Sequence, residues 1–147
     1  MAILKIRELG DPVLRTKTKQ VEEVNDKTRK LLDDMAETMY DANGVGLAAP
    51  QIGISKKIIV IDVGSGLIEI INPEIIEESD QRYIDQEGCL SIPEQTGKVK
   101  RSKEVTVKGL NRDGKEIEVK GKALLARALQ HEIDHLQGKL FIDRLER

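Results

Sequence analysis

The segment Gln130-His131-Glu132-Ile133-Asp134-His135-Leu136 contains both histidines of this 147-residue chain. It has the pattern H-E-x-x-H, which on a helix places the two imidazoles one turn apart on the same face. Two neutral imidazoles in this position can bind a divalent metal ion, and the carboxylate between them can accept a proton from water. The alternative is a pair of surface histidines on an amphipathic helix.

Apolar residues surround the histidines at helical spacing. At about 100° per residue, more than half of the helix circumference is apolar, and both histidines lie within that arc. The apolar positions are Leu124, Leu125, Ala128, Leu129, Ile133 and Leu136, and the opposite side carries Arg127, Gln130, Asp134 and Gln137. Because an unpaired buried imidazole is costly, the pattern favours a metal-binding helix. It also turns Asp134 away from the metal, toward the surface or a salt bridge.

The two histidines need a third ligand, and the residues after them offer few. Many H-E-x-x-H enzymes take this ligand from a downstream helix or loop, but only Asp143 and Glu146 follow as carboxylates here. The only cysteine, Cys89, lies upstream. A lone cysteine is most often a small buried apolar residue. Together with His131 and His135, however, it would form a Cys-His-His set with an open position for water, suited to Fe(II), Zn(II) or Co(II) rather than Mg(II) or Ca(II).

The composition excludes several classes of protein. The 24 basic and 26 acidic residues give a net charge of -2, so there is no basic field of the kind that a general nucleic-acid binder carries. No apolar run is long enough to span a membrane, and the N-terminus lacks the apolar core of a signal peptide. We expect a single cytoplasmic domain over residues 1–147, without an internal disulfide, a membrane segment or a direct nucleic-acid site.

The pattern along the chain predicts an α+β fold. After an irregular arm over residues 1–24, a helix begins at Asn25 or Asp26 and stops at Asn43-Gly44. Strands are expected over residues 57–63, 67–72 and 75–78, with Pro73 separating the last two. A hairpin follows over residues 103–119, whereas the segment before Cys89 reads as polar and the segment after it as a loop. We therefore expect short, mostly antiparallel strands packed around a central metal-binding H-E-x-x-H helix, with a second, N-terminal helix.

The glycine-rich segment Gly44-Val45-Gly46-Leu47-Ala48-Ala49-Pro50-Gln51 matches the dinucleotide-binding pattern G-x-G-x-x-A. It follows a helix instead of a strand, and Pro50 and Gly53 disfavour a helix directly after it. A loop or short strand whose backbone approaches a ligand is the better interpretation. Gln51 would then present its side-chain amide at the end of this segment.

Three segments together resemble the signature motifs of the peptide deformylase family, in that family's order and approximate spacing. They are Gly44-Val45-Gly46-Leu47-Ala48-Ala49-Pro50-Gln51, Glu87-Gly88-Cys89-Leu90-Ser91 and His131-Glu132-Ile133-Asp134-His135. The similarity covers nearly the whole chain, including residues 10–15 and 138–141. It implies removal of the formyl group from the N-terminal formylmethionine of new polypeptides, with release of formate.

The resemblance also implies a role for each site residue. Cys89, His131 and His135 would hold the metal, Fe(II) in the native enzyme with Zn(II), Ni(II) or Co(II) as substitutes, and Glu132 would be the acid and base. The side chain of Gln51 and the backbone N–H of Leu90 would face the developing oxyanion. The substrate backbone would pair beside Gly46 and Gly88, and the methionine side chain would contact Val45, Leu124 and Ala128. Arg127 lies where an apolar residue would suit this pocket better. Glu87 and Arg101 would form a structural ion pair.

The expected partners are N-formylmethionyl nascent polypeptides, which places a monomeric enzyme transiently near the ribosome. Some bacterial relatives continue into a C-terminal helix associated with ribosome docking. This chain stops at Leu145-Glu146-Arg147, a departure from those relatives that leaves docking of that form open.

Two alternatives remain open. The first is a small zinc peptidase that uses the two histidines without Cys89. The second is a non-catalytic fold with a structural metal, which would need neither the carboxylate of Glu132 nor the amide of Gln51.

Overall fold

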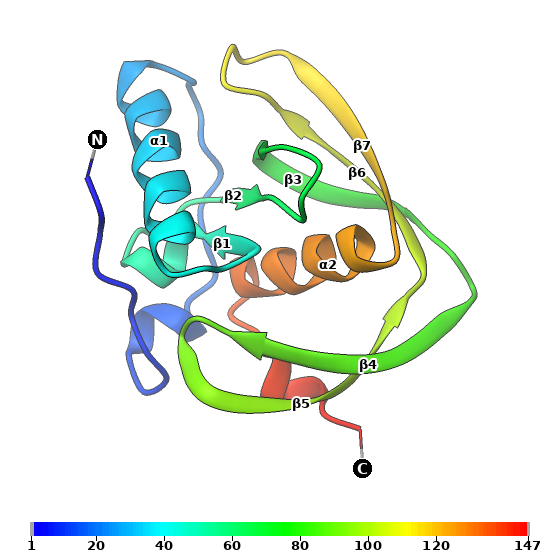
Figure 1. The fold of residues 1–147 in the computed structure, drawn as a ribbon. Coiled ribbons are helices and arrows are strands. Elements are labelled where there is room, and N and C mark those ends of the chain that lie inside the picture. The colour runs from blue at the N-terminus through cyan, green and yellow to red at the C-terminus, as the bar shows by residue number, and fades with distance from the viewer. Residues whose placement is uncertain (1, 147) are drawn as a thin grey trace.

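The chain folds around the helix that carries the two histidines, α2 (Figure 1). The computed structural model describes residues 2–146. The elements are α1 (Asp26–Asp41), β1 (Gly46–Ala48), β2 (Ile58–Ile61), β3 (Ile68–Glu78), β4 (Arg82–Cys89), β5 (Ile92–Ser102), β6 (Glu104–Leu110), β7 (Glu116–Lys122) and α2 (Leu124–Leu136), with short 3₁₀ helices at Pro12–Arg15, Ala49–Ile52 and Phe141–Arg144. The predicted α+β class, with antiparallel strands around α2 and a second helix near the N-terminus, is confirmed.

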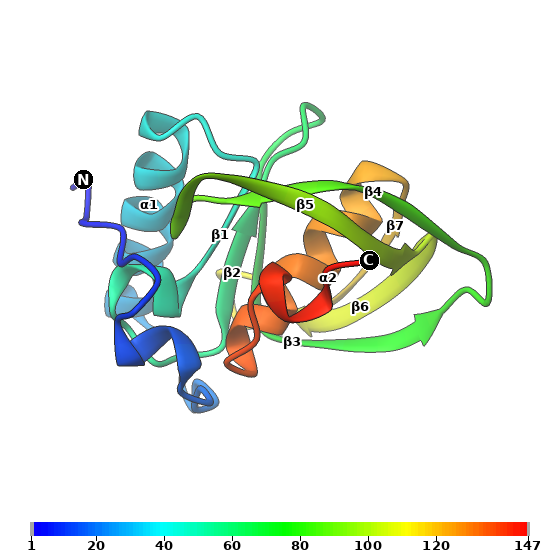
Figure 2. The same cartoon turned by 90° about the horizontal axis from the view of Figure 1, so that it is seen from below.

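Two antiparallel sheets lie on opposite sides of α2. Five strands pair in the order β1-β2-β3-β6-β7, and β4 and β5 form a separate two-stranded hairpin. Helix α2 contacts strands of both sheets, and Figure 2 shows it between the hairpin and the strands β3 and β6. Helix α1 packs on β1 and β2, on the other face of the larger sheet. The histidine helix is therefore enclosed by elements from distant parts of the sequence.

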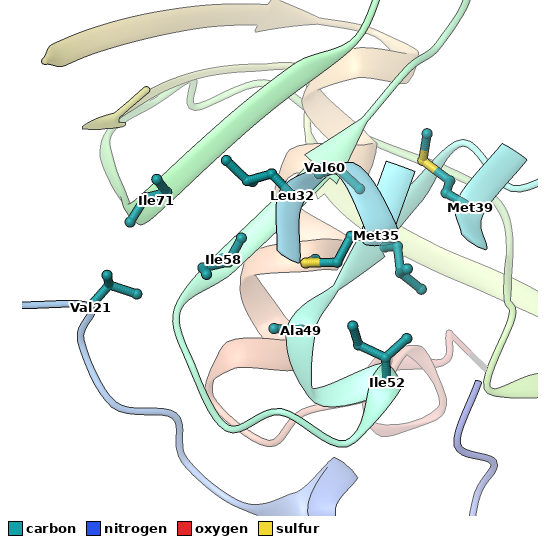
Figure 3. Packing of buried hydrophobic residues seen from close by; sticks show 10 residues of the cluster. Val21, Leu32, Met35, Met39, Ala49, Ile52, Ile58, Val60 and Ile71 are labelled. Atoms are coloured by element: carbon teal, nitrogen blue, oxygen red, sulfur yellow. The ribbon is translucent and has the colours of Figure 1, made fainter. Parts of the chain in front are cut away.

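Strand β2 is buried on both faces because a helix covers each of them. Ile58 and Val60 belong to the apolar cluster that includes residues of α1, part of which is drawn in Figure 3. Ile59 and Ile61 belong to the cluster that includes residues of α2. Successive side chains of a strand point to opposite faces, so a strand between two helices needs an unbroken apolar run. The prediction of a buried strand here is confirmed.

Both α-helices occupy the predicted positions. Helix α1 begins after Asn25, whose side-chain oxygen accepts a hydrogen bond from the N–H of Thr28 at 3.1 Å, and this capping satisfies one free donor of the first turn. It ends before Asn43, whose φ of 59° lies in the left-handed region that ends many helices. No helix within residues 2–146 is both long enough and apolar enough to cross a membrane.

The prediction that Pro73 separates two strands is wrong. Strand β3 runs through it, with a shift of register toward β6 between Ile71 and Glu74. A bulge frees one residue from the hydrogen-bond ladder, and proline, which has no N–H, is tolerated there. The side chain of Asn72, at a φ of 55°, holds the bulge by bonding both the N–H and the carbonyl of Val21.

The sequence interpretation also missed the hairpin of β4 and β5. Its strands pair from Arg82 opposite Ser102 to Gly88 opposite Thr96. The inward positions include Glu87 and Arg101, which are charged and buried. Because strand patterns are recognised by apolar alternation, charged residues at inward positions concealed the hairpin.

Candidate active site

Two elements bring three potential metal ligands together. Cys89 is the last residue of β4, and His131 and His135 lie one turn apart on α2. One ligand atom from each residue lies within 4.8 Å of the other two. The sulfur of Cys89 is 3.4 Å from Nε2 of His135, close to the roughly 3.5 Å expected for sulfur and nitrogen that share a tetrahedral metal ion.

The surroundings of the imidazoles suit metal binding. Nδ1 of His131 donates to a carboxylate oxygen of Glu87 at 2.9 Å, and this bond leaves Nε2 as the ring nitrogen available to a metal ion once its proton is lost. Nδ1 of His135 is buried and has no hydrogen-bond partner among the described residues. A thiol and two imidazoles, with one ring oriented by a carboxylate, form a donor set that fits a divalent transition metal.

Burial and neighbouring groups shift the pKa values of the two imidazoles in opposite directions. Burial disfavours the protonated ring of His131, but hydrogen bonds with Cys89 and Glu87 outweigh it and raise the pKa of His131 to about 10. Burial lowers the pKa of His135 well below its usual value. The neutral form of His135, the form that binds metals, is therefore favoured by its environment.

Glu132 is buried beside the two histidines. One carboxylate oxygen, Oε1, receives no hydrogen bond from residues 2–146, and burial raises the pKa of Glu132 to about 7. The other oxygen lies so close to Gly46 that a Cβ there would be 2.5 Å away. A carboxylate that titrates near neutrality is suited to both accepting and donating a proton.

The side-chain amide of Gln51 is fixed in one orientation. Its oxygen accepts a hydrogen bond from the N–H of Ala48 at 2.9 Å, and its nitrogen donates to the hydroxyl of Ser91 at 3.1 Å. The same nitrogen lies 3.5 Å from the sulfur of Cys89. The donor end of the amide therefore faces the cluster of potential ligands.

A pocket of about 480 Å³ opens onto these groups. The sequence-predicted residues that line it are Val45, Gly46, Gln51, Glu87, Gly88, Cys89, Leu90, Leu124, Ala128, His131 and Glu132. Val45 and Leu124 are large apolar side chains that are about half exposed, at 47% and 51%. Exposed apolar surface at the mouth of a pocket is typical of a binding site for an apolar group.

Two predicted site residues, His135 and Arg101, lie outside the pocket lining. His135 contacts the sulfur of Cys89, and Arg101 pairs with Glu87 through Nε at 2.8 Å and Nη2 at 2.9 Å. Burial disfavours the charge of Glu87, but hydrogen bonds from Arg101 and His131 hold its pKa well below the usual value. Glu87 is therefore an ionised carboxylate against His131.

The prediction that the polar side of α2 lies opposite its buried face is wrong for two of its residues. Arg127 and Gln130 are buried, whereas the predicted salt bridge of Asp134 is present, with Arg101 and Arg144. Arg127 also lines the pocket and donates to Glu87. Sequence reasoning missed the burial of Arg127 and Gln130, although the position of Arg127 one turn before His131 was a usable signal, because side chains four residues apart share a helix face.

The comparisons with known proteins cover the whole described fold. Residues 3–147 match the profile of the family described as Polypeptide deformylase. A peptide deformylase of Halothermothrix orenii is 62% identical over 149 residues, which cover 100% of this chain and 96% of that protein. The crystal structure of peptide deformylase from Thermotoga maritima superposes with a TM-score of 0.98 at 45% identity, covering 100% of both chains. A peptide deformylase from Synechococcus elongatus, in complex with actinonin, gives 0.96 at 43% identity, covering 100% of this chain and 81% of that one.

Proposed function

Because the chain belongs to the polypeptide deformylase family, we propose that its pocket binds the formylated N-terminus of a polypeptide and that Glu132 drives hydrolysis there. The enzyme removes the formyl group from N-terminal formylmethionine of new polypeptides and releases formate. The observation that carries the assignment of residues is the meeting of Cys89, His131 and His135 beside the carboxylate of Glu132. A structural metal site would need no acid or base at that position.

The family is metal-dependent, and Cys89, His131 and His135 are the residues that would hold the ion. When bound, the ion supplies Lewis acidity, which polarises the formyl carbonyl and makes water a better nucleophile. We assign Fe(II) as the native metal, with Zn(II), Ni(II) or Co(II) as substitutes. A thiolate beside two imidazoles supports this group of metals over Mg(II) or Ca(II).

Glu132 acts as the base and then as the acid. It accepts a proton from the attacking water and delivers that proton to the amine that leaves. Its burial, which raises its pKa to about 7, supports both steps, because a group that titrates near the working pH gives and takes protons with similar ease. Gly46 leaves room for the carboxylate at this position.

Two donors stabilise the negative charge that develops on the formyl oxygen. They are the side-chain amide of Gln51 and the backbone N–H of Leu90, the residue after Cys89. The bonds of Gln51 to Ala48 and Ser91 support this role, because a donor already fixed in position needs no reorganisation during the reaction.

The remaining pocket residues select the substrate. Val45, Leu124 and Ala128 contact the methionine side chain, and the backbone beside Gly46 and Gly88 pairs with the substrate backbone. All five line the same pocket as Cys89. The formyl carbon bears only hydrogen, so a close-fitting site admits it and excludes bulkier acyl groups.

The nature of the substrate suggests where the enzyme works. Formylated nascent chains are made in the bacterial cytoplasm, so we place the enzyme there, as a monomer that acts on chains emerging from a nearby ribosome. A pull-down of ribosomes and a sedimentation measurement test the contact with ribosomes and the monomeric state.

Formate release tests the proposed reaction and its ligands. Protein prepared without oxygen should release formate from a formyl-Met peptide, and elemental analysis should find about one transition-metal ion per chain. Cys89→Ala should lose both the ion and the activity. If Cys89→Ala keeps both, a peptidase-like site of two histidines without the cysteine is the better assignment. If the wild-type protein binds the ion without releasing formate, the metal is structural.

A further inference from the structure

Cys89 lies on a hairpin and the two histidines lie on a helix, so no hydrogen bonds of a sheet join the elements that carry them. The hairpin of β4 and β5 carries Cys89 and forms its own sheet, and α2 carries the histidines. A two-stranded hairpin is marginally stable by itself. Side-chain contacts between the hairpin and α2 therefore have a large part in fixing the sulfur relative to the imidazoles.

Arg127 connects α2 to both strands of the hairpin. Its guanidinium donates to the carboxylate of Glu87 and to the carbonyl of Tyr83 at 3.0 Å, both on β4. It also donates to the carbonyl of Val99 on β5 at 2.9 Å. It lies over the Tyr83 ring, 4.6 Å from the centroid. One planar side chain thus holds three points of the hairpin, which the single ammonium of a lysine reproduces poorly.

A second arginine, on the hairpin, connects the hairpin to α2 from the other side of the contact. Arg101, on β5, donates to Asp134 on α2 at 2.6 Å and to both oxygens of Glu87. Asp134 lies between the two histidines in sequence, and it also accepts a bond from Arg144 at 2.6 Å. Arg101 and Arg127 meet at Glu87, whose other contact is Nδ1 of His131. The two connections therefore converge on a carboxylate that orients a potential metal ligand.

We propose that Arg127 and Asp134 are positioning residues, which hold the hairpin against α2 and thereby set the spacing between the sulfur of Cys89 and the two imidazoles. The proposal rests on the metal site proposed above. Neither residue touches the ion or the reacting atoms in this arrangement. Loss of either connection lets the sulfur move relative to the rings, so the site binds a metal ion less tightly and with altered geometry.

Metal affinity tests the proposal directly. Arg127→Met keeps a long side chain against the pocket but removes every donor, and Asp134→Asn removes the charge that Arg101 binds. Zinc affinity is measured by competition with a chelator, and the absorption of the cobalt-loaded proteins reports the bond between the thiolate and the ion. Each variant should bind zinc roughly 10–100-fold more weakly, with a weakened or shifted thiolate band.

Arg112→Met is the matched control. Arg112 also bridges elements, from the turn after β6 to Glu69 on β3 and Asp33 on α1, but it does not connect the hairpin to α2. It should lower thermal stability without changing zinc affinity or the cobalt spectrum. Asp134→Asn still tests the proposal if Arg127→Met does not fold, because asparagine is nearly the same size as aspartate and the Asp134 side chain is not fully buried.

The outcomes separate this proposal from the proposed function. If the wild-type protein binds cobalt without a thiolate band, the metal site itself is wrong and the proposal fails with it. If the wild-type protein shows the band, but the Arg127 and Asp134 variants match it in affinity and spectrum, only the positioning role is overturned. A loss of affinity in Arg112→Met as large as in Arg127→Met would also overturn it, because general destabilisation would then explain both.

Discussion

A methyl group on Gly46 would lie 2.5 Å from Oε2 of Glu132. This is closer than two such atoms can approach, so the carboxylate has to shift toward the pocket that it lines. Gly46→Ala should therefore displace Glu132 and lower kcat by about 10²-fold, the typical cost of misplacing a catalytic group by an ångström. Steady-state formate release measures the effect, and metal content should be unchanged.

A double substitution distinguishes this effect from a general loss of structure. If Gly46→Ala acts through Glu132, adding it to Glu132→Ala should cost little further activity, because coupled residues are not additive. Full additivity of the two losses would contradict the interpretation. Thermal unfolding of each variant, compared with the wild type, controls for stability.

Glu132→Ala should abolish turnover while the protein keeps its metal. A base of this kind contributes roughly 10²–10⁴-fold to the rate, and the substitution removes no hydrogen bond from Oε1 to the described residues, so the fold should persist. Formate release, elemental analysis and thermal unfolding together test this. Turnover near the wild-type rate would show that the proton transfers are assigned to the wrong residue.

The elements that the sequence predicts best are those whose signals are local. Helix α1 has a cap at Asn25 and apolar residues at helical spacing, and β2 has an unbroken β-branched run. The hairpin of β6 and β7 has alternating residues and a turn at residues 111–114. Each signal lies within a window of a few residues, so local sequence is sufficient to find it.

The hairpin of β4 and β5 could not be found in this way, because its inward side is stabilised by contacts with α2. Glu87 and Arg101 are acceptable inside the protein only because they pair with each other and with Arg127 and Asp134. Pattern reasoning treats such residues as exposed. The same long-range pairing explains why Arg127, on the polar side of α2, is buried.

The potential metal ligands also divide into those with a local sequence signal and one without. The spacing of His131 and His135 is a local signal, whereas no local pattern links Cys89 to them, and only the fold brings the three within 4.8 Å. The sequence indicates Cys89 only through its residue type, the need for a third ligand and the resemblance to a family. The fixed orientation of Gln51 through Ser91 had no sequence signal.

Gln51→Leu should lower kcat by roughly 10²–10³-fold, the usual cost of removing one oxyanion donor, with a smaller effect on KM. The N–H of Ala48 also loses its acceptor, which should reduce stability by about 1–3 kcal/mol. Kinetics measured well below the unfolding temperature separate the two effects. Ser91→Ala is the matched variant, because it removes a partner of the amide and leaves the amide in place.

The Ser91→Ala result should lie between those of Gln51→Leu and the wild type. The amide then keeps its bond to Ala48 and loses only one of the contacts that hold its donor end. An unchanged kcat in Gln51→Leu would remove Gln51 from the mechanism, whatever the result for Ser91→Ala.

Asp34 should make the protein sensitive to acid at a place far from the active site. Its buried carboxylate, on α1, accepts hydrogen bonds from Lys30 and from the N–H of Ala2, each at 2.8 Å. These bonds, chiefly that of Lys30, lower the pKa of Asp34 below its usual value. Because the pKa is lower in the folded state, the stabilisation is present above the unfolded-state pKa of about 4 and is lost as the pH falls through the folded value.

Asp34→Asn should therefore be less stable than the wild type by about 1 kcal/mol near neutral pH, and this difference should shrink as the pH falls below about 4. Urea unfolding of both proteins across this range measures it. Release of metal in acid affects both proteins alike, so the difference in unfolding free energy is the informative quantity. Asp80→Asn, at an exposed position between β3 and β4, removes the same charge and should show no such trend. If the difference in unfolding free energy between Asp34→Asn and the wild type is the same at every pH, the ionised carboxylate of Asp34 is not what stabilises the contact of Ala2 with α1.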